Sequence, residues 1–198
     1  MKSIEQIHKY WKAPDDGKNK PEDYLNGKER TAFLVGQIKD VAVTNDTILE
    51  IGCNCGRNLN GLWGAGFRKL SGIEISKSAV DVMEKNYTSM FKRINVSVGP
   101  AETELKKIKS KSVDIIFTMA VLEHIHEDSA VQVFLEMKRI FKKFLITVED
   151  EKKISERHFQ RNYKDVFEGI GLKEIKSFRC NKIQGLDKNY IFRIFNNG

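Results

Sequence analysis

Cysteine and long apolar runs are both scarce in this sequence. Only three of its 198 residues are cysteines, too few for the disulfide framework of a small secreted protein. No apolar run is long enough to cross a membrane, and residues 1–6 lack the apolar segment of a signal peptide. We therefore expect a cytoplasmic protein that does not associate with membranes.

The cysteines also lack the spacing of a metal site. Cys53 and Cys55 are separated by one residue inside a glycine-containing turn, and no second cysteine pair accompanies them. We interpret both as small residues that fit the turn, not as zinc ligands or redox-active thiols.

The last third of the chain has too few acidic residues to balance its basic ones. Residues 137–198 hold 15 lysines and arginines against 8 aspartates and glutamates, which accounts for the whole net charge of +7. Such an excess can bind nucleic acid or an acidic substrate, but a solvated lysine-rich surface is its more common cause. Nucleic acid is thus a possible partner but not a favoured one.

The most informative stretch is T-I-L-E-I-G-C-N-C-G, residues 47–56. Its first five residues are β-branched or apolar around one glutamate, which is typical of a strand buried on both faces. Gly52 and Gly56 follow, and residues 57–63 can begin a helix. A strand, a glycine turn and a helix let backbone N–H groups approach a ligand at the carboxyl end of a parallel strand.

A second acidic residue points to a nucleoside. Glu74 ends the next expected strand, 24 residues after Glu50, where a carboxylate can accept both hydroxyls of a ribose. A dinucleotide fingerprint needs G-x-G-x-x-G, but Asn54 stands where its middle glycine would be. The turn therefore disfavours close approach of a pyrophosphate.

The stretch instead resembles the first motif of class I S-adenosylmethionine-dependent methyltransferases. That motif is an acid, any residue, glycine, small residues and a second glycine, and Glu50, Gly52 and Gly56 match it. Asn54 departs from the commonest form. The resemblance covers roughly residues 46–198 and includes Glu74 and a final pair of strands.

The resemblance implies an α/β fold with a Rossmann-like, doubly wound sheet. We expect seven strands, mostly parallel, with an antiparallel C-terminal hairpin and helices on both faces. Residues 46–198 would form the core and residues 1–45 a helical arm or cap. The strands are expected at 47–51, 70–75, 94–98, 113–117, 144–148, 174–180 and 190–195.

Helix signals lie between these strands. Ser76 is a good N-cap for a helix to residue 87. Asp128 or Ser129 is expected to cap the next long helix, and another should cover residues 161–168. The long helix is expected to bury the apolar residues Val131, Phe134, Leu135, Ile140 and Phe141.

The N-terminal arm allows two interpretations. Apolar residues three and four apart predict a short helix near Trp11, residues 14–20 form a polar loop, and Pro21 begins a helix to about residue 41. These helices either pack on one face of the sheet or act as a lid that brings Tyr10, Trp11, Tyr24 and Arg30 to the ligand.

The resemblance assigns cofactor contacts to individual positions. The glycine turn would hold the methionine part, with Glu50 and Asn54 near its ammonium, while Glu74 would bind the ribose and Ile75 would pack on adenine. Pro100 occupies the usual acid position of the third loop, so Ala101 and Glu102 are the substitutes. The predicted set is Arg30, Glu50, Gly52, Cys53, Asn54, Gly56, Glu74, Ile75, Ala101, Glu102 and Met119.

Methyl transfer from a sulfonium mainly requires alignment of the nucleophile, the methyl carbon and the sulfur. A base is needed only when the acceptor arrives protonated, and histidine titrates near neutral pH. We predict His124, Glu149 and His158 as catalytic residues. The acids at 149–151 together with His158 could bind a cationic acceptor, or less plausibly a divalent metal, and Arg161 could bind an acidic substrate group.

The leading hypothesis is an S-adenosylmethionine-dependent enzyme that methylates oxygen or nitrogen of a small polar metabolite or biosynthetic intermediate. An RNA or protein methyltransferase that uses the basic C-terminal third is one alternative, and a non-catalytic cofactor-binding regulator is another. The stretch after the fourth strand lacks the Asn/Asp-Pro-Pro-aromatic signature of amino-group nucleobase enzymes, and no Pro-Cys pair provides a cytosine C5 nucleophile. Nothing in the sequence indicates the oligomeric state.

Overall fold

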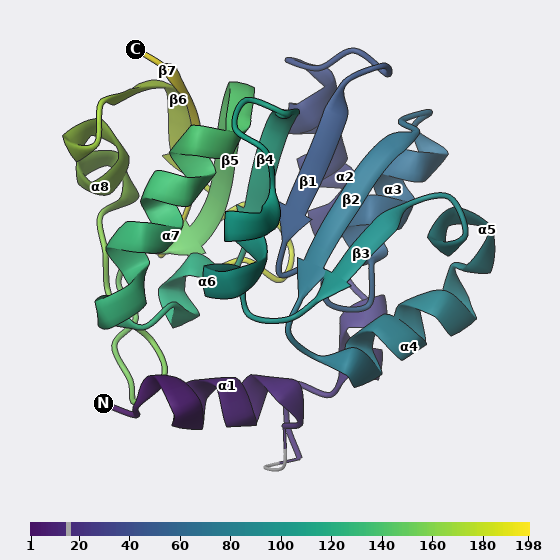
Figure 1. The fold of residues 1–198 in the computed structure, drawn as a ribbon, viewed down its shortest axis with the longest axis horizontal. Coiled ribbons are helices and arrows are strands. Elements are labelled where there is room, and N and C mark those ends of the chain that lie inside the picture. Colours follow the sequence, from purple (N-terminus) through teal and green to yellow (C-terminus); the bar gives the residue numbers. More distant parts are fainter. Residues whose placement is uncertain (15–16) are drawn as a thin grey trace.

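Seven strands form one sheet in the order β3-β2-β1-β4-β5-β7-β6 (Figure 1). The computed structural model describes residues 1–14 and 17–198. Strands β1 to β5 pair in parallel, whereas β7 runs antiparallel to both β5 and β6. The strands are β1 (Thr47–Ile51), β2 (Lys69–Glu74), β3 (Asn95–Val98), β4 (Val113–Met119), β5 (Phe141–Asp150), β6 (Leu172–Arg179) and β7 (Tyr190–Asn197). The predicted doubly wound sheet with its antiparallel hairpin is confirmed.

Helices cover both faces of this sheet. The α-helices are α1 (Ile4–Lys12), α2 (Lys28–Lys39), α3 (Arg57–Gly64), α4 (Lys77–Asn86), α5 (Thr88–Phe91), α6 (Ala101–Glu104), α7 (Glu127–Ile140) and α8 (Tyr163–Gly169). Short 3₁₀ turns are η1 (Pro21–Leu25), η2 (Leu105–Lys107) and η3 (Leu122–His124). Helices α7 and α8 pack on one face, and α2 to α5 pack on the other.

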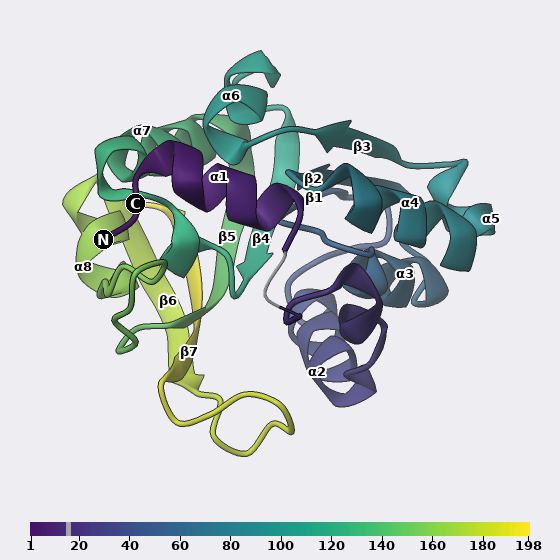
Figure 2. The same ribbon diagram turned by 90° about the horizontal axis from the view of Figure 1, so that it is seen from below.

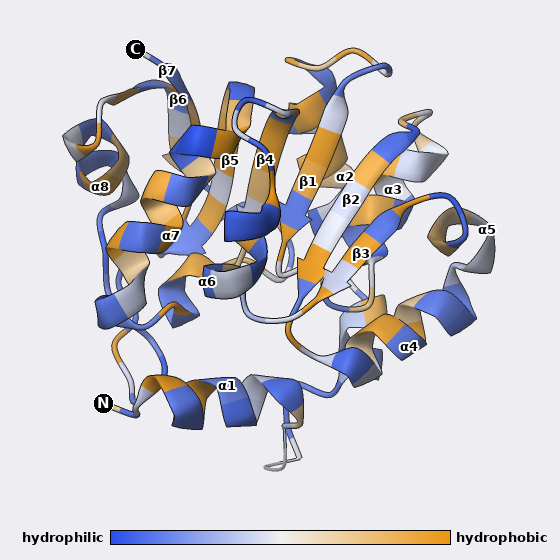
Figure 3. Ribbon diagram, in the orientation of Figure 1, coloured by the Kyte–Doolittle hydropathy of each residue, from blue (hydrophilic) through white to orange (hydrophobic). Residues whose placement is uncertain are grey.

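Each face of the sheet carries its own apolar cluster, because successive side chains of a strand point to opposite sides. In β1, Leu49 and Ile51 belong to the cluster under α7 and α8, whereas Ile48 belongs to the cluster under α2 and α3. Figure 3 shows hydrophobic residues concentrated in the central strands. None of the helices in the described part of the chain combines the length and hydrophobicity needed to cross a bilayer.

The single helix expected from Pro21 to about residue 41 is divided in two. Gly27 adopts a left-handed φ of 108°, which separates η1 from α2. Arg57 stabilises this break, since its Nη1 donates hydrogen bonds to the carbonyl oxygens of Tyr24 and Asn26 at 2.9 and 2.7 Å. A side chain from another helix therefore overrides the local helical signal.

The expected start of the long helix α7 is also wrong. His126, not Asp128 or Ser129, is the N-cap, and its Nδ1 accepts from the backbone N–H of Asp128. The buried face is Ala130, Val133, Phe134, Met137 and Ile140. Val131 and Leu135, expected inside, are 63% and 42% exposed, and Phe141 already belongs to strand β5.

Helix α1 crosses the carboxyl ends of the central strands (Figure 2). Ser3 and Gln6 form a capping box at its start, and Ile7 and Tyr10 are buried. The hydroxyl of Ser76, after β2, donates to the carbonyl oxygen of Lys12 at 3.2 Å. Of the polar loop expected at 14–20, residues 15 and 16 lie outside the described residues.

A matched pair of glycines on α3 tests the packing of the arm on the core. A Cβ at Gly61 would lie 2.4 Å from Cγ2 of Thr31 on α2, whereas a Cβ at Gly64 would meet nothing within 4 Å. Thr31 cannot turn away freely, because its hydroxyl accepts from Arg57 and donates to Asn58.

We therefore expect Gly61→Ala to lower the free energy of unfolding by about 1–3 kcal/mol through overpacking. Gly64→Ala should be neutral or stabilise by up to about 1 kcal/mol. Chemical denaturation of both variants checks this, and equal stabilities would show that α2 does not pack on α3 as described.

Candidate active site

A cavity of about 640 Å³ lies between the carboxyl ends of β1, β2 and β4 and helix α1. This volume is within the range of small-ligand sites. It is lined by twelve of the fourteen predicted site residues: Arg30, Glu50, Gly52, Cys53, Asn54, Glu74, Ile75, Ala101, Glu102, Met119, His124 and His158. Gly56 and Glu149 do not line it.

The turn after β1 brings the backbone close to the cavity. Gly52, Asn54 and Gly56 have φ values of 70°, 45° and 75°, so three of five residues are left-handed. A Cβ at Gly52 would lie 2.4 Å from Val121, and a Cβ at Gly56 would lie 2.5 Å from Met83. Gly52 thus permits contact with the loop after β4, and Gly56 permits the approach of helix α4.

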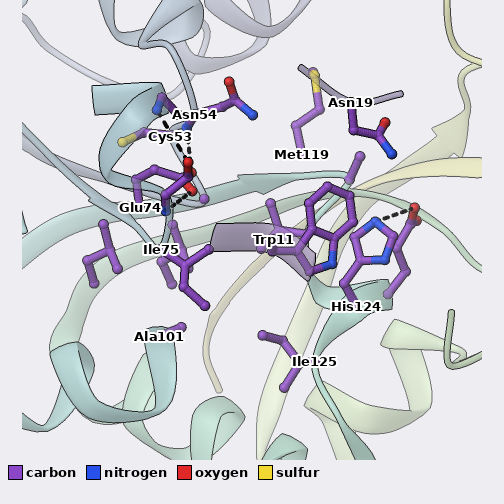
Figure 4. Close-up of a pocket in the computed structure, with 18 of the residues that line it drawn as sticks. Trp11, Asn19, Cys53, Asn54, Glu74, Ile75, Ala101, Met119, His124 and Ile125 are labelled. Carbon is purple, nitrogen blue, oxygen red and sulfur yellow. Dashed lines mark hydrogen bonds and ion pairs between the residues drawn. The ribbon is translucent and has the colours of Figure 1, made fainter. Parts of the chain in front are cut away.

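Glu74 joins the ends of two strands. Its carboxylate accepts from the backbone N–H of Asn54 at 2.7 Å and from that of Ser76 at 2.8 Å (Figure 4). The side chain is almost fully buried, and burial raises its pKa although both hydrogen bonds act in the opposite direction. Glu74 therefore fixes the conformation of the turn and also lines the cavity. Its contact with a ribose stays a prediction.

Glu50 is a buried carboxyl with one free oxygen. Oε1 accepts from Nδ2 of Asn58 at 2.8 Å, whereas Oε2 is buried and has no partner among the described residues. Burial raises the pKa of Glu50 to about 8. Because an unpaired buried oxygen is costly, the site favours a ligand that brings a hydrogen-bond donor or a positive charge to Glu50.

Arg30 offers the opposite charge in the same cavity. Its Nε is buried without a hydrogen-bond partner in the described chain, and it packs against Gly27 and Gly185. Arg57 lies near both Arg30 and Glu50, since the charges of both influence its pKa. Among the described residues, a carboxyl oxygen and a guanidinium nitrogen without partners face the same cavity, a combination that suits the ammonium and carboxylate of an amino acid.

The side of the cavity predicted to hold adenine is formed by the ends of β2 and β3. Ile75 is partly exposed, whereas Ala101 and Cys53 are buried. Oε1 of Glu102 pairs with Nε2 of His8 at 3.3 Å and accepts from the hydroxyl of Ser129 at 3.1 Å. Glu102 thus connects α1 to the core beside the position predicted for adenine.

Glu123, His124 and His158 form a cluster in the cavity wall. Their ligand atoms lie within 4.8 Å of one another, and Oε1 of Glu123 is 3.6 Å from Nε2 of His124 and 4.0 Å from Nε2 of His158. The rings of Trp11 and His124 are 4.5 Å apart, and Figure 4 shows them side by side. The structure therefore brings the two predicted histidines together and adds Glu123.

Burial sets the protonation of this cluster. It lowers the pKa of His124 to about 3 and that of His158 to about 4, with Lys153 and Arg157 lowering the latter further. Burial raises the pKa of Glu123 to about 7, against a hydrogen bond from the Asp150 N–H. Both imidazoles are thus neutral at physiological pH.

Glu149 lies outside the cavity, contrary to its predicted catalytic position. Strand β5 continues to Asp150, so Glu149 is fully buried in the sheet. Its Oε2 accepts from the backbone N–H groups of Val121 and Leu122 at 2.9 and 3.0 Å. Glu149 therefore positions the loop after β4, and burial raises its pKa well above the usual range.

The expected group of acids after β5 is dispersed. Asp150 accepts from the N–H groups of Lys152 and Lys153, and Glu151 forms an ion pair with Arg193 at 2.7 Å. Arg161, considered for a substrate acid, instead donates to the carbonyl oxygens of Leu122 and Ile125. Of the residues predicted for the site in this region, His158 alone lines the cavity.

Several cavity residues were not predicted, because they come from loops or from a distant strand. Asn19, Lys153 and Tyr190 line the cavity, and Glu123 was considered as a base but not selected. The Tyr190 hydroxyl lies 3.5 Å from Oε1 of Glu123. Tyr190 begins β7, and the register of a distant strand brings it here, so no local sequence signal marks it.

Residues 48–143 match the family model described as methyltransferase domain. No curated protein matches the sequence. The fold resembles a SAM-dependent methyltransferase of Aquifex aeolicus, with 16% identity, a TM-score of 0.67 and coverage of 90% of this chain and 98% of that chain. It also resembles magnesium protoporphyrin IX methyltransferase of Synechocystis PCC 6803 with bound SAH, with 12% identity, a TM-score of 0.75 and coverage of 99% and 100%.

The fold is therefore that of the class I methyltransferases. Residues 48–143 thus carry a methyltransferase domain, and the whole chain has the fold of these S-adenosylmethionine-dependent enzymes. Glu50 Oε2 and Arg30 Nε, which lack partners among the described residues, and the residues of the glycine turn that line the cavity fit the amino-acid part of S-adenosylmethionine.

Glu74→Ala tests the cofactor end of the cavity. We expect a loss of affinity for S-adenosylmethionine and its demethylated product of at least about tenfold, or about 1.4 kcal/mol, because the turn and a ribose contact are both lost. Calorimetric titration measures this. Glu84→Ala, on the exposed side of α4, is the control, and equal affinities in both variants would contradict the assignment.

The raised pKa of Glu50 predicts that the affinity for the cofactor depends on pH. With a pKa of about 8 it is protonated in the free protein near pH 6, and a bound ammonium would favour its ionised form. Binding then releases a proton, so affinity should rise by up to about tenfold per pH unit between about pH 5.5 and 7.5. Calorimetry in buffers of different ionisation enthalpy measures the released proton.

Glu50→Gln should abolish this proton release, because its side chain cannot ionise. A wild-type affinity that does not change with pH would show that Glu50 does not meet the ammonium.

Proposed function

We propose that the chain transfers the methyl group to an oxygen or nitrogen of a small polar metabolite or biosynthetic intermediate. The supporting observation is the extent of the cavity, which continues past Met119 from Glu50 and Glu74 to the cluster of Glu123, His124 and His158. The first end suits the cofactor. The second end then holds the acceptor next to the methyl group.

Helix α1 supports a small acceptor. Its residues Ile4, Ile7, His8 and Trp11 line the cavity, and α1 lies across the strand ends (Figure 2). Residues 1–45 thus act partly as a cap through α1 and partly as a packing layer through α2, whose Leu34 and Ile38 are buried in the core. A cap excludes bulk water, as methyl transfer requires.

The basic C-terminal third offers less support for an RNA acceptor. Many of its cations are neutralised by acids within the fold, so they are not all available to phosphates. These ion pairs involve Arg139, Lys142, Lys143, Lys164, Lys176 and Arg193. Part of the excess of cations therefore serves to form ion pairs within the fold.

We infer that the reacting atom of the acceptor lies against His124 and His158. Both neutral imidazoles line the cavity, with Nε2 3.6 and 4.0 Å from Oε1 of Glu123, and Trp11 and Tyr190 lie beside this cluster. Glu149 acts indirectly in this arrangement, by fixing the loop that carries Glu123 and His124. The acceptor is polar, because apolar ligands would leave the cluster without partners.

Activity is tested with methyl-labelled S-adenosylmethionine and separate pools of small metabolites, RNA and protein. We expect label in the small-molecule pool together with formation of the demethylated cofactor. His158→Ala should lower kcat by at least about tenfold, as expected for loss of a group at the reacting atom, without changing affinity for S-adenosylmethionine.

Gln132→Ala, on the exposed side of α7, is the matched control and should leave turnover unchanged. Label in the RNA or protein pool alone would overturn the proposal in favour of a macromolecular acceptor. Cofactor binding without label in any pool would favour a non-catalytic regulator.

A further inference from the structure

We propose that Glu123, His124 and His158 bind a divalent transition-metal ion through Oε1, Nε2 and Nε2, respectively. The proposal that this ion binds the methyl acceptor rests on the proposed function, but the proposal that the ion binds to these three residues does not. Among the acidic, histidine and cysteine side chains of the described residues, these three could share one ion, because their ligand atoms all lie within 4.8 Å of one another. It lies in the wall of the cavity and not on the outer surface.

Each side chain is oriented by a hydrogen bond to its other polar atom, and the proposed ligand atom of Glu123, Oε1, has only a long contact of 3.5 Å with the Tyr190 hydroxyl among the hydrogen bonds of the described residues. Nδ1 of His124 pairs with the carbonyl oxygen of Arg157 at 2.8 Å, and Nδ1 of His158 pairs with the hydroxyl of Ser155 at 2.5 Å. Oε2 of Glu123 accepts from the N–H of Asp150 at 2.7 Å. Metal-binding histidines are characteristically oriented by such a bond to their other nitrogen.

The spacing is close to that of a metal site. Metal–nitrogen and metal–oxygen bonds of about 2.0–2.2 Å place tetrahedral ligands about 3.4 Å apart. The distances from Oε1 of Glu123 to the two Nε2 atoms are 3.6 and 4.0 Å. The ligand atoms of the two histidines lie within 4.8 Å of each other, so an ion would draw them together by up to about 1.4 Å, through rotation of two rings already in edge contact.

The charges around the cluster act in both directions on a cation. Lys153 and Arg157 oppose a cation, since both charges act on His158, whereas the Asp150 carboxylate favours one. An ion bound at Oε1 would replace any proton on Glu123, because metal ligands must be deprotonated.

Two imidazoles and one carboxylate define the class of ion. This donor set suits Zn²⁺, Mn²⁺, Fe²⁺ or Co²⁺, whereas Mg²⁺ and Ca²⁺ prefer sites composed of oxygen. Three protein ligands leave at least one coordination position open towards the cavity. An oxygen of the acceptor would take that position, which makes an oxygen nucleophile the substrate class.

A bound ion changes how the acceptor loses its proton. The Nε2 lone pairs would be engaged, so neither histidine could act as the base. The ion would instead lower the pKa of the bound oxygen, as it does for bound water. The two roles of the histidines therefore exclude each other and can be separated by experiment.

The test is titration of chelator-treated protein with Co²⁺, followed by its visible absorption, and with Mn²⁺ and Zn²⁺ by calorimetry. No cofactor or acceptor is added, so the result does not depend on methyl transfer. We expect one ion per chain. His158→Ala and Glu123→Gln should each weaken binding by at least about tenfold, and Ser155→Ala should weaken it less.

His8→Ala is the control, because His8 lines the same cavity but pairs with Glu102 outside the cluster. Titration with S-adenosylmethionine verifies that each variant is folded. Absence of binding by all three ions, or equal binding by wild type and His158→Ala, would overturn the metal site. Ion binding with turnover that resists chelators would overturn its role in the reaction and leave the methyltransferase proposal intact.

Discussion

Buried carboxylates that bind backbone N–H groups across the strand ends are the constraint on which this site depends. Glu74 at the end of β2 holds the turn after β1, and Glu149 in β5 holds the loop after β4. Glu123 in that loop in turn accepts from Asp150 at the end of β5. Each bond crosses between neighbouring strands, so the loops are fixed by the sheet and not by their own sequence. The cavity keeps its shape because these loops cannot move independently.

The same burial divides the cavity into two chemically different ends. At the first, Glu50 and Arg30 each present a buried polar atom without a partner, which suits the charged groups of an amino acid. At the second, burial keeps His124 and His158 neutral and leaves lone pairs available for a proton or a metal ion. The end of the cavity proposed for the cofactor therefore offers buried groups that can be charged, whereas the end proposed for the acceptor offers neutral imidazoles.

The sequence identified most of the residues that line the cavity around the turn after β1, because that part of the cavity is local. A strand, a turn and a helix lie within residues 47–63, and left-handed glycines mark the turn directly. The acceptor end depends on contacts between distant residues: Phe159 donates to the carbonyl of Glu123 at 2.8 Å, which brings His158 to His124. Glu149 was misplaced because β5 extends two residues beyond its expected end, which turns this side chain from the loop into the sheet. The break at Gly27 likewise depends on Arg57, a contact that helical periodicity cannot reveal.

A crystal structure with the demethylated cofactor tests the central claim most directly, because it locates the sulfur. We predict that its amino-acid part meets Glu50 and Arg30, its ribose meets Glu74, and its sulfur faces the space beside Met119. The open volume between the sulfur and Nε2 of His124 and His158 should then admit an acceptor atom about 3–3.5 Å from the methyl position. A cofactor whose adenine fills the space at the histidines, or whose sulfur faces away from them, would contradict this account.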